Sequence, residues 1–342
     1  MICTFTQAIQ TATAELLTDS RTHVIGLGAT YPNGLDGTMG DLATKFQSQV
    51  HDMPCSESAV TGMCVGMSIN ELRPILHHGR IEFALHAMDA ILTQAAKWSY
   101  MFGGKYPCPL TLRIAMGRQW GNGPQHTFTQ KGIFVVPGLK VVAPATPSMA
   151  YHLLAGAAQE PNPVIYLESR WLYKTKQTVK TENVPVFGQA QVLRHGSDVT
   201  IVAVADMVLE ALRAAKLLAA IGISVKVIDA VSIYPVDSKF IAYQTKCTNT
   251  GYLFAVDAAT PAYSFAHEII AQVGSRNSYA ITLPDYPCPT APAMTAEYYP
   301  SAELIANRIT DCMYRPELFQ ETKTFEELNL PPTDNFDAYM HI

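Results

Sequence analysis

Short apolar runs alternate with helical patterns along the first half of the chain. Consecutive apolar residues predict strands at 23–26, 110–115 and 164–167. Apolar positions at helical spacing predict helices at 5–18, 57–70, 83–101 and 147–159. Strands that alternate with helices are typical of βαβ units, which form a mostly parallel sheet with helices on both faces. The first half is therefore predicted to be an α/β domain.

The pattern is interrupted at residues 174–196 and then starts again. This stretch is polar and has no clear period, so it is the best candidate for a domain boundary. A buried strand is predicted at 200–205, a helix at 207–221 that Gly222 ends, and a further strand at 225–229. These elements predict a second α/β domain.

Residues 311–342 have a third kind of pattern. They contain Pro316, Pro331 and Pro332 and no apolar run of strand length. We interpret them as an extension that either lies over the fold or docks on a neighbouring subunit. The sequence leaves both arrangements open.

The composition narrows the classes of partner. Charged residues make up 15% of the 342 residues, and the mean hydropathy is +0.08. Low charge indicates either large cores or apolar surface that other subunits bury. The 24 Lys and Arg against 29 Asp and Glu give a net charge of −5. This balance lacks the basic surface that a nucleic acid partner requires.

The sequence carries no sign of export or membrane insertion. It has no run of about 18 apolar residues, and its first residues lack the basic and apolar regions of a signal peptide. The seven cysteines form no Cys-x-x-Cys pair, so neither a disulfide framework nor a zinc site is predicted. We therefore expect a cytoplasmic protein with reduced thiols and no membrane partner.

Several common catalytic and nucleotide-binding motifs are absent from the sequence. There is no GxGxxG, GxxxxGK[ST], GxSxG or HExxH. The Gly-rich segment Gly34–Gly40 lacks the spacing of a phosphate-binding loop and is predicted to be an ordinary loop. The His77–His78 pair shows no ligand spacing and is interpreted as packing or surface. The chain therefore does not account for phosphate binding by itself.

Glu57 is the first candidate for chemistry. It opens a predicted helix that is rich in small residues, such as Ala59, Gly62 and Gly66. Small side chains let a backbone or a ligand approach closely. The alternative is that Glu57 is simply an acid in a first helical turn, where the helix dipole favours negative charge. Local pattern alone does not decide between these interpretations.

Six segments in order resemble a known family. They are DMPCSESAVTGMCVGMSINELRPI (52–75), AMDAILTQAAKWSYMFGG (87–104), VPGLKVVAPATP (136–147), and residues 160–173, 197–229 and 289–304. Together they resemble the beta subunit of pyruvate dehydrogenase and related 2-oxo acid dehydrogenases, within the transketolase-like family of thiamine diphosphate enzymes. The resemblance implies a pyrimidine-binding domain at 1–180, a linker at 181–196, a transketolase C-terminal domain at 197–310 and an extension at 311–342.

The resemblance also implies roles for three residues. Glu57 falls on the glutamate that hydrogen-bonds a ring nitrogen of the cofactor's aminopyrimidine and activates it. Phe83 falls on the aromatic residue that stacks against this ring. His126, in GNGPQHTF, falls on a histidine that faces the reacting part of the cofactor. For Phe83 and His126, a core aromatic and a solvated loop histidine stay open as alternatives.

The cofactor implied by the resemblance is thiamine diphosphate with Mg²⁺. In such enzymes the diphosphate and the metal are held by a GDG motif followed by Asn-Asn, and this sequence has neither. The resemblance therefore implies an alpha-type partner that carries this motif, in an α2β2-like assembly with a second copy of this chain. It also implies a structural K⁺ bound by the backbone carbonyls of Ala157, Ala158, Glu160 and Asn162.

Four segments depart from the pattern of these relatives. Gly26–Ala29 lacks two acids, and Gly79–Ile81 introduces Arg80, which can bind a carboxylate or phosphate. The segment Thr127–Lys131 follows His126 and is one residue shorter, and Asp257–Tyr263 replaces a Gly-rich stretch. We predict Arg80 and Phe128 as residues of the substrate channel. The resemblance also implies docking on a lipoyl acyltransferase core, but the extension at 311–342 leaves this docking open.

Three functions are compatible with these features. The leading hypothesis is a beta-type subunit of a heteromeric thiamine diphosphate enzyme that decarboxylates a 2-oxo acid and transfers the acyl or hydroxyalkyl unit. The second is half of a split transketolase-like enzyme that moves a two-carbon ketol unit between sugars. The third is a scaffold subunit without catalytic activity.

Overall fold

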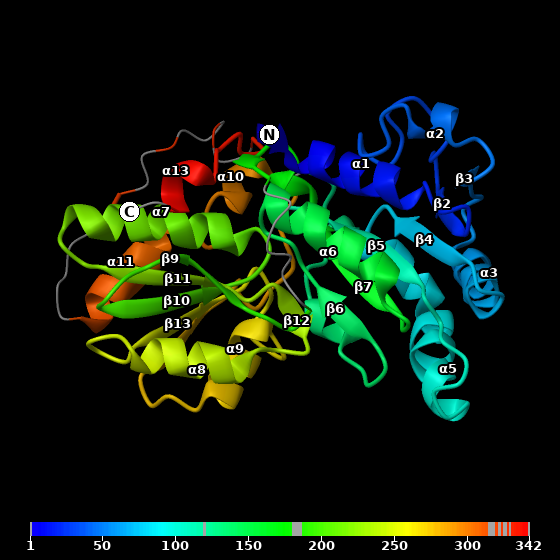
Figure 1. The fold of residues 1–342 in the computed structure, drawn as a ribbon. Coiled ribbons are helices and arrows are strands. Elements are labelled where there is room, and N and C mark those ends of the chain that lie inside the picture. Colours follow the sequence, from blue (N-terminus) through cyan, green and yellow to red (C-terminus); the bar gives the residue numbers. More distant parts are fainter. Residues whose placement is uncertain are drawn as a thin grey trace.

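The chain folds into two α/β lobes that lie side by side (Figure 1). The computed structural model describes residues 2–118, 121–179, 187–313, 319–320, 323, 327 and 330–340. None of the helices in these residues has both the length and the apolar composition to cross a bilayer. The fold class expected from the sequence, two α/β units, is confirmed.

The N-terminal lobe is built on a seven-stranded sheet, in the order β12-β6-β7-β5-β4-β2-β3. All neighbours pair in parallel except β12 with β6. The strands are β2 (Thr22–Gly26), β3 (Val50–Asp52), β4 (Arg73–His78), β5 (Thr111–Met116), β6 (Lys140–Val142), β7 (Val164–Ser169) and β12 (Ser232–Tyr234). A separate antiparallel pair joins β1 (Ile2–Thr4) to β8 (Lys176–Thr178).

Helices cover both faces of this sheet because successive strand residues point to opposite sides. Val24 and Ile75 belong to one apolar core, and their neighbours Ile25 and Leu76 belong to the other. The long helices α1 (Phe5–Leu16) and α6 (Pro147–Gln159) pack on the first side, and α3 (Glu57–Ile69) packs on the second. The shorter helices are α2 (Leu42–Lys45), α4 (Ile81–Ala84) and α5 (Ala96–Met101).

The helix predicted at 83–101 is not a single α-helix. Between α4 and α5 the backbone forms a 3₁₀ turn at Leu85–Ala87 and a π-helical stretch at Asp89–Ala95. Within this stretch the hydroxyl of Thr93 donates to the carbonyl of Asp89 at 2.7 Å. Periodicity alone did not indicate this change.

The C-terminal lobe has a five-stranded sheet, in the order β14-β13-β10-β11-β9. Its strands are β9 (Gln191–Arg194), β10 (Val199–Ala203), β11 (Val225–Asp229), β13 (Leu253–Val256) and β14 (Ser278–Ile281). Its helices are α7 (Met207–Ala220), α8 (Ser238–Lys246), α9 (Phe265–Val273), α10 (Pro292–Thr295) and α11 (Ala302–Cys312). Helices α7 and α11 cover one face of the sheet, and α8 and α9 cover the other (Figure 1).

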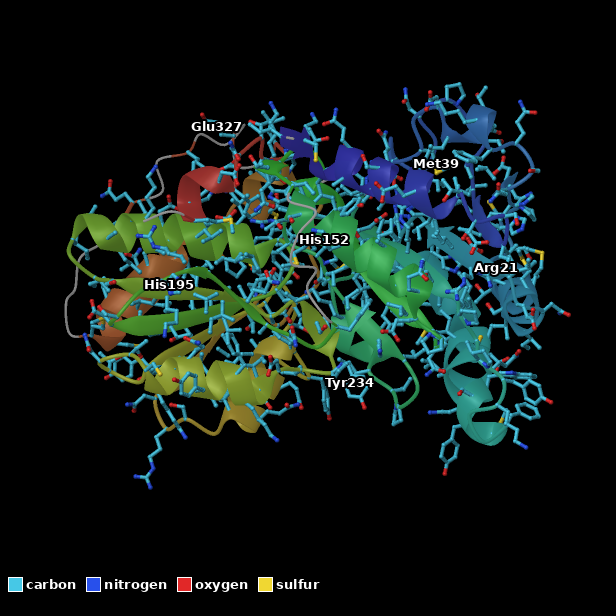
Figure 2. The ribbon with its side chains drawn as sticks, viewed as in Figure 1. Arg21, Met39, His152, His195, Tyr234 and Glu327 are labelled. Atoms are coloured by element: carbon cyan, nitrogen blue, oxygen red, sulfur yellow. The ribbon has the colours of Figure 1, made fainter. Side chains whose placement is uncertain are left out.

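The two lobes exchange elements where a simple linker was predicted. Residues 181–186 of the predicted linker lie outside the described residues, but Gln191–Arg194 form β9, which pairs antiparallel with β11. In turn β12, from the C-terminal half, completes the N-terminal sheet beside β6. Tyr234, at the end of β12, lies between the lobes (Figure 2). Both strands are short and lie at sheet edges, so their pairing depends on tertiary contacts.

The described part of the extension lies over the fold, one of the two arrangements that the sequence left open. The backbone of Lys176 donates to the Asp334 carbonyl at 2.7 Å and accepts from Phe336 at 2.9 Å. Arg213 of α7 donates to both carboxylate oxygens of Asp334, at 3.1 and 2.6 Å. The extension, which includes α13 (Asp337–Met340), therefore links β8 of one lobe to α7 of the other.

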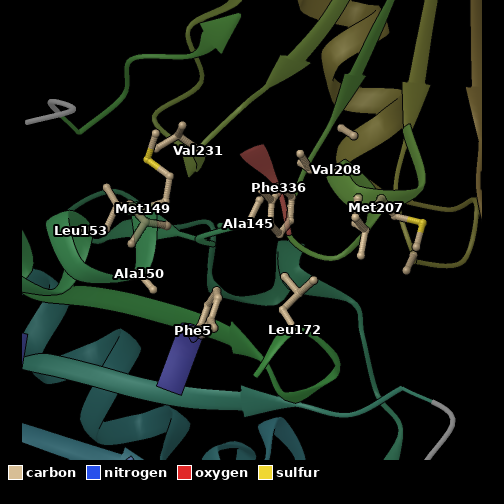
Figure 3. Close-up of a cluster of buried hydrophobic side chains, with 14 of the residues drawn as sticks. Phe5, Ala145, Met149, Ala150, Leu153, Leu172, Met207, Val208, Val231 and Phe336 are labelled. Carbon is tan, nitrogen blue, oxygen red and sulfur yellow. The ribbon is translucent and has the colours of Figure 1, made fainter. Parts of the chain in front are cut away.

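One apolar cluster joins the lobes and the extension. Phe336 is fully buried and lies beside residues of both lobes (Figure 3). The neighbours labelled there include Phe5 and Leu172 from the N-terminal lobe and Met207 and Val208 from α7. Because a fully buried aromatic side chain contributes up to about 3 kcal/mol, this contact stabilises the arrangement of the two lobes.

Asp229 makes the stability of the fold depend on pH. It is fully buried at the end of β11, and one oxygen accepts from the Val231 backbone at 2.9 Å. Among the described residues nothing bonds its other oxygen. Burial raises the pKa of Asp229 from 3.8 to about 7.

We predict that the free energy of unfolding falls as pH rises from about 4 to 7, because the native state then binds more protons than the unfolded state. Asp229→Asn keeps the acceptor for Val231 and removes the titration. Urea unfolding at pH 5 and pH 7.5 should show that the free energy of unfolding falls less in this variant than in the wild type. Each pH unit between the unfolded and folded pKa values of Asp229 accounts for roughly 1.4 kcal/mol. An unchanged pH dependence would contradict the assignment.

Candidate active site

Glu57 lies at the start of α3, directly after β3 and a Pro-containing turn. The first helical bond runs from the Val60 amide to the Ser56 carbonyl at 3.0 Å, so Glu57 occupies the first turn. Its side chain lines a cavity of about 260 Å³ at the carboxyl ends of β2 and β4. Ligands of open α/β sheets bind at this edge. The lining residues are Leu27, Leu35, Asp36, Met53, Glu57, His77, His78, Gly79, Arg80, Phe83 and Arg170.

Phe83 and Arg80 line the same cavity as Glu57, although they come from the segment after β4. The guanidinium carbon of Arg80 lies 5.4 Å from the centre of the Phe83 ring, within the range of a cation–π contact. The His126 ring meets Phe83 edge-on, with centroids 5.9 Å apart and an angle of 74°. The structure thus brings together four of the predicted site residues.

Phe128 is placed differently. Its backbone amide donates to Glu82 at 2.6 Å, but its side chain lines a neighbouring cavity of about 590 Å³ with Tyr286 and Tyr298 of the C-terminal lobe. Phe128 therefore lies beside the Glu57 cavity rather than in its lining. His126 contacts Phe83, which lines the Glu57 cavity, and Phe128, two residues later, lines the neighbouring cavity.

His77 and His78 form the inner wall of the cavity, which the sequence analysis did not anticipate. Both are almost fully buried at the end of β4. The Nε2 atom of His78 lies 3.1 Å from the Thr61 hydroxyl, and burial together with His77 lowers the pKa of His78 to about 3. His78 is therefore neutral at physiological pH. The Nε2 atom of His77 lies 3.3 Å from a carboxylate oxygen of Glu168.

Behind His77, a fully buried ion pair between Arg113 and Glu168 joins β5 to β7. Arg113 donates through Nε and Nη2 to the Glu168 carboxylate at 2.9–3.2 Å. Tyr173 also donates to Glu168, at 3.0 Å, and Arg113 reaches the Thr38 hydroxyl at 2.9 Å. Burial raises the pKa of Glu168, but Arg113 and His77 outweigh it and hold the value at about 2. The carboxylate therefore stays ionised.

A signal for this pair exists in the sequence. Arg113 is a single charge within the apolar run LTLRIA, and Glu168 is a single acid within VIYLES. A lone charge in a buried strand requires a partner of opposite sign. The analysis of the sequence treated both runs only as strands, because nothing in them indicates which strands become neighbours.

The segment expected to bind K⁺ makes contacts that do not fit the ion. The Ala158 carbonyl accepts a 2.6 Å bond from the guanidinium of Arg73, and the Ala157 carbonyl accepts from the Glu160 amide at 3.2 Å. The Glu160 side chain pairs with Lys140 at 2.6 Å. The guanidinium of Arg73 already places positive charge at the Ala158 carbonyl, so a potassium ion beside it would be repelled.

The comparisons with known proteins agree with this fold and site. The family model "Transketolase, pyrimidine binding domain" matches residues 3–176, and "Transketolase, C-terminal domain" matches residues 188–305. The chain belongs to the transketolase-like family. The resemblance inferred from the six sequence segments is confirmed.

Relatives of this transketolase-like chain include beta subunits of two enzymes. It is 36% identical over 282 residues to the acetoin:2,6-dichlorophenolindophenol oxidoreductase subunit beta of Cupriavidus necator, covering 80% of this chain and 83% of the relative. It is 31% identical to the mitochondrial pyruvate dehydrogenase E1 component subunit beta of Saccharomyces cerevisiae, covering 91% and 88%. A solved "Split gene transketolase, inactive beta4 tetramer" has the same fold, with a TM-score of 0.75, 19% identity and coverage of 92% and 99%.

The Arg113–Glu168 pair gives a testable prediction for the wall of the cavity. Glu168→Gln leaves the Arg113 charge buried without a counter-charge, so we expect a loss of about 3–5 kcal/mol in the free energy of unfolding. Asp19→Asn, which removes an exposed ion pair with Arg21, is the matched control and should change stability little. Denaturant unfolding measures both. Equal, small effects would show that the buried pair does not support the fold.

Proposed function

We propose that this chain is the beta-type subunit of a heteromeric thiamine diphosphate enzyme that decarboxylates a 2-oxo acid and passes on the acyl or hydroxyalkyl unit. The observation that carries the proposal is the convergence of Glu57, Phe83 and His126 at the carboxyl edge of the N-terminal sheet. The relatives named as beta subunits of pyruvate dehydrogenase E1 and of the acetoin enzyme support the class of reaction.

The cavity fits the aminopyrimidine half of the cofactor. It offers a carboxyl group, an aromatic ring and buried imidazoles in one small space. When bound, thiamine diphosphate supplies the carbanion chemistry at the carbonyl carbon of the substrate. In this proposal Glu57 holds a proton at its carboxyl group and hydrogen-bonds a pyrimidine ring nitrogen, while the face of Phe83 fixes the ring by stacking.

His126 and Arg80 would act on the substrate. The contact of the His126 ring with Phe83 supports a role for His126 in moving a proton of the substrate. Arg80, whose guanidinium carbon lies 5.4 Å from the centre of the Phe83 ring, can pair with the carboxylate of a 2-oxo acid. The neutral His78 and the paired Glu168 would keep the inner wall free of charges that compete for Arg80.

The diphosphate and Mg²⁺ are assigned to an alpha-type partner. In the part of the chain that the structure describes, no group of three or more acidic, His or Cys side chains is arranged to hold a metal. The sequence lacks the GDG and Asn-Asn motifs as well. The proposed assembly contains two copies of each subunit and is cytoplasmic, and a lipoyl acyltransferase core is one candidate for the acyl acceptor.

The surface beside Glu57 is the proposed contact with the alpha-type partner. On α3, Ala59 and Met63 are exposed, and Met63 keeps half of its surface accessible. They line a largely apolar groove of about 550 Å³ together with Met53, which also lines the Glu57 cavity. A partner in this groove would bring its own residues next to Glu57 and would bury apolar surface that accounts for the low charge of the chain.

The role of Glu57 can be tested in the complex reconstituted with the alpha-type partner. Glu57→Gln keeps the size of the side chain but cannot pass a proton, so exchange of the thiazolium hydrogen of bound cofactor should slow by about 10²–10⁴-fold. Rapid-quench deuterium exchange followed by NMR measures this rate. Glu71→Gln, at an exposed residue just after α3, is the control and should exchange like the wild type. Normal exchange in Glu57→Gln would exclude the assigned role.

A split transketolase activity is the second candidate. It is favoured by the likeness of the fold to a split-gene transketolase and by Arg80, which could also pair with a sugar phosphate. Offering the complex pyruvate-type acids and, separately, ketose phosphates distinguishes the two. We expect release of carbon dioxide with the acids. Ketol transfer without carbon dioxide would support the second candidate, and a complex that binds no cofactor would support a scaffold.

A further inference from the structure

The loop that carries His126 is fixed to both lobes. It runs through two 3₁₀ turns, Pro124–His126 and Lys131–Phe134. On the N-terminal side the Phe128 amide donates to Glu82, the residue next to Phe83, at 2.6 Å. On the C-terminal side Lys131 enters the other lobe. The position of His126 over Phe83 therefore depends on anchors in two domains.

The anchor in the C-terminal lobe is a buried ion pair. The Nζ atom of Lys131 lies 2.6 Å from Oδ1 of Asp257, and each side chain is only 1% exposed. Lys131 also donates to the Thr129 carbonyl at 3.3 Å. The second oxygen of Asp257, which directly follows β13, accepts from the Phe265 amide at the start of α9. The pair thus ties the loop to the end of a strand and the start of a helix.

Further contacts surround the ion pair. The side-chain amide of Gln130 donates to the Ala262 carbonyl, and the Thr260 hydroxyl donates to the Gln130 side-chain oxygen at 3.3 Å. These contacts join Thr127–Lys131 to Asp257–Tyr263. Both segments depart from the pattern of the 2-oxo acid dehydrogenases, and they lie too far apart in the chain for a local pattern to connect them. In the structure the ion pair and these hydrogen bonds join the two segments.

We propose that Lys131 and Asp257 are positioning residues that set His126 against Phe83, so that the C-terminal lobe controls the geometry of a site in the N-terminal lobe. The proposal rests on the proposed function, because it assigns His126 a role in the reaction. A buried ion pair is costly to desolvate and adds little net stability compared with an apolar pair. Its particular contribution is direction, since Nζ must meet a carboxylate oxygen at hydrogen-bond distance.

The test compares one double variant with single variants, in the full chain and in its complex with the alpha-type partner. Lys131→Met combined with Asp257→Asn removes both charges and keeps an acceptor for the Phe265 amide. We expect amide hydrogen exchange in residues 121–134 of the chain alone to become about tenfold faster. In the complex, kcat should fall by about tenfold because His126 is misplaced, with little change in cofactor affinity.

Lys226→Met is the matched control. Lys226 is a buried lysine like Lys131 but lies within the C-terminal lobe. Its Nζ atom donates to the backbone and side chain of Gln244 at 2.8 and 3.0 Å. Its loss should lower thermal stability without altering kcat or exchange in the loop. If the double variant does not fold, Gln130→Ala removes an outer anchor and should move exchange and kcat in the same direction, to a smaller extent.

Unchanged exchange in residues 121–134 would overturn the proposal, as would an equal loss of kcat in Lys226→Met. The exchange experiment needs neither cofactor nor substrate. If the complex proves inactive toward 2-oxo acids, the proposed function fails, while faster exchange in the double variant still supports the positioning of the loop by Lys131 and Asp257.

Discussion

The parallel pairing of β2, β4, β5 and β7 is the constraint on which the candidate site depends. It brings the carboxyl ends of these strands to one edge of the sheet, where the segments that follow them meet. Glu57 lies in the first turn of α3, His77 lies near the end of β4, and Phe83 lies in α4, which follows β4. If neighbouring strands ran in opposite directions, these residues would lie at opposite ends of the sheet.

The charged residues at this edge form two groups, one buried in the core and one that lines the cavity. Arg113 and Glu168 neutralise each other inside the core, with further hydrogen bonds from Tyr173 to Glu168 and from Arg113 to Thr38. In front of them His78 is neutral, and the charged residues that line the cavity are Glu57, Arg80 and the pair of Asp36 and Arg170, whose atoms lie 3.1 Å apart. Among the described residues Nη1 of Arg113 has no hydrogen-bond partner, so the network is not completely paired. The bonds that it does make hold the Arg113 and Glu168 side chains behind the cavity.

The site is a product of both lobes, although its lining belongs to the first. Strand β12 completes the N-terminal sheet, Phe336 of the extension is buried between the lobes, and Lys131 anchors the His126 loop on Asp257. Each contact crosses the boundary that composition suggests. A rotation of one lobe would strain all three, so the relative position of the lobes and the geometry at His126 are coupled.

Sequence patterns predicted much of the framework. The helices at α3, α6 and α7 and the strand at β11 lie within one or two residues of the predicted positions, because strong periodicity or consecutive apolar residues reflect burial directly. The π-helical stretch at Asp89–Ala95 and strand β9 were missed. The first lies inside a continuous helical pattern, and the second is a four-residue strand whose place depends on the edge that β11 provides.

For the site, the sequence by itself determined the two α/β units, the family and the candidates Glu57, Phe83 and His126, because the order and spacing of the six segments follow the family. Only the tertiary structure decided the partners. It paired Arg113 with Glu168 and Lys131 with Asp257, placed Arg73 at the carbonyl of Ala158, and laid the extension across both lobes. Such contacts join residues 55 to 126 positions apart, and no local pattern records which distant charges will meet.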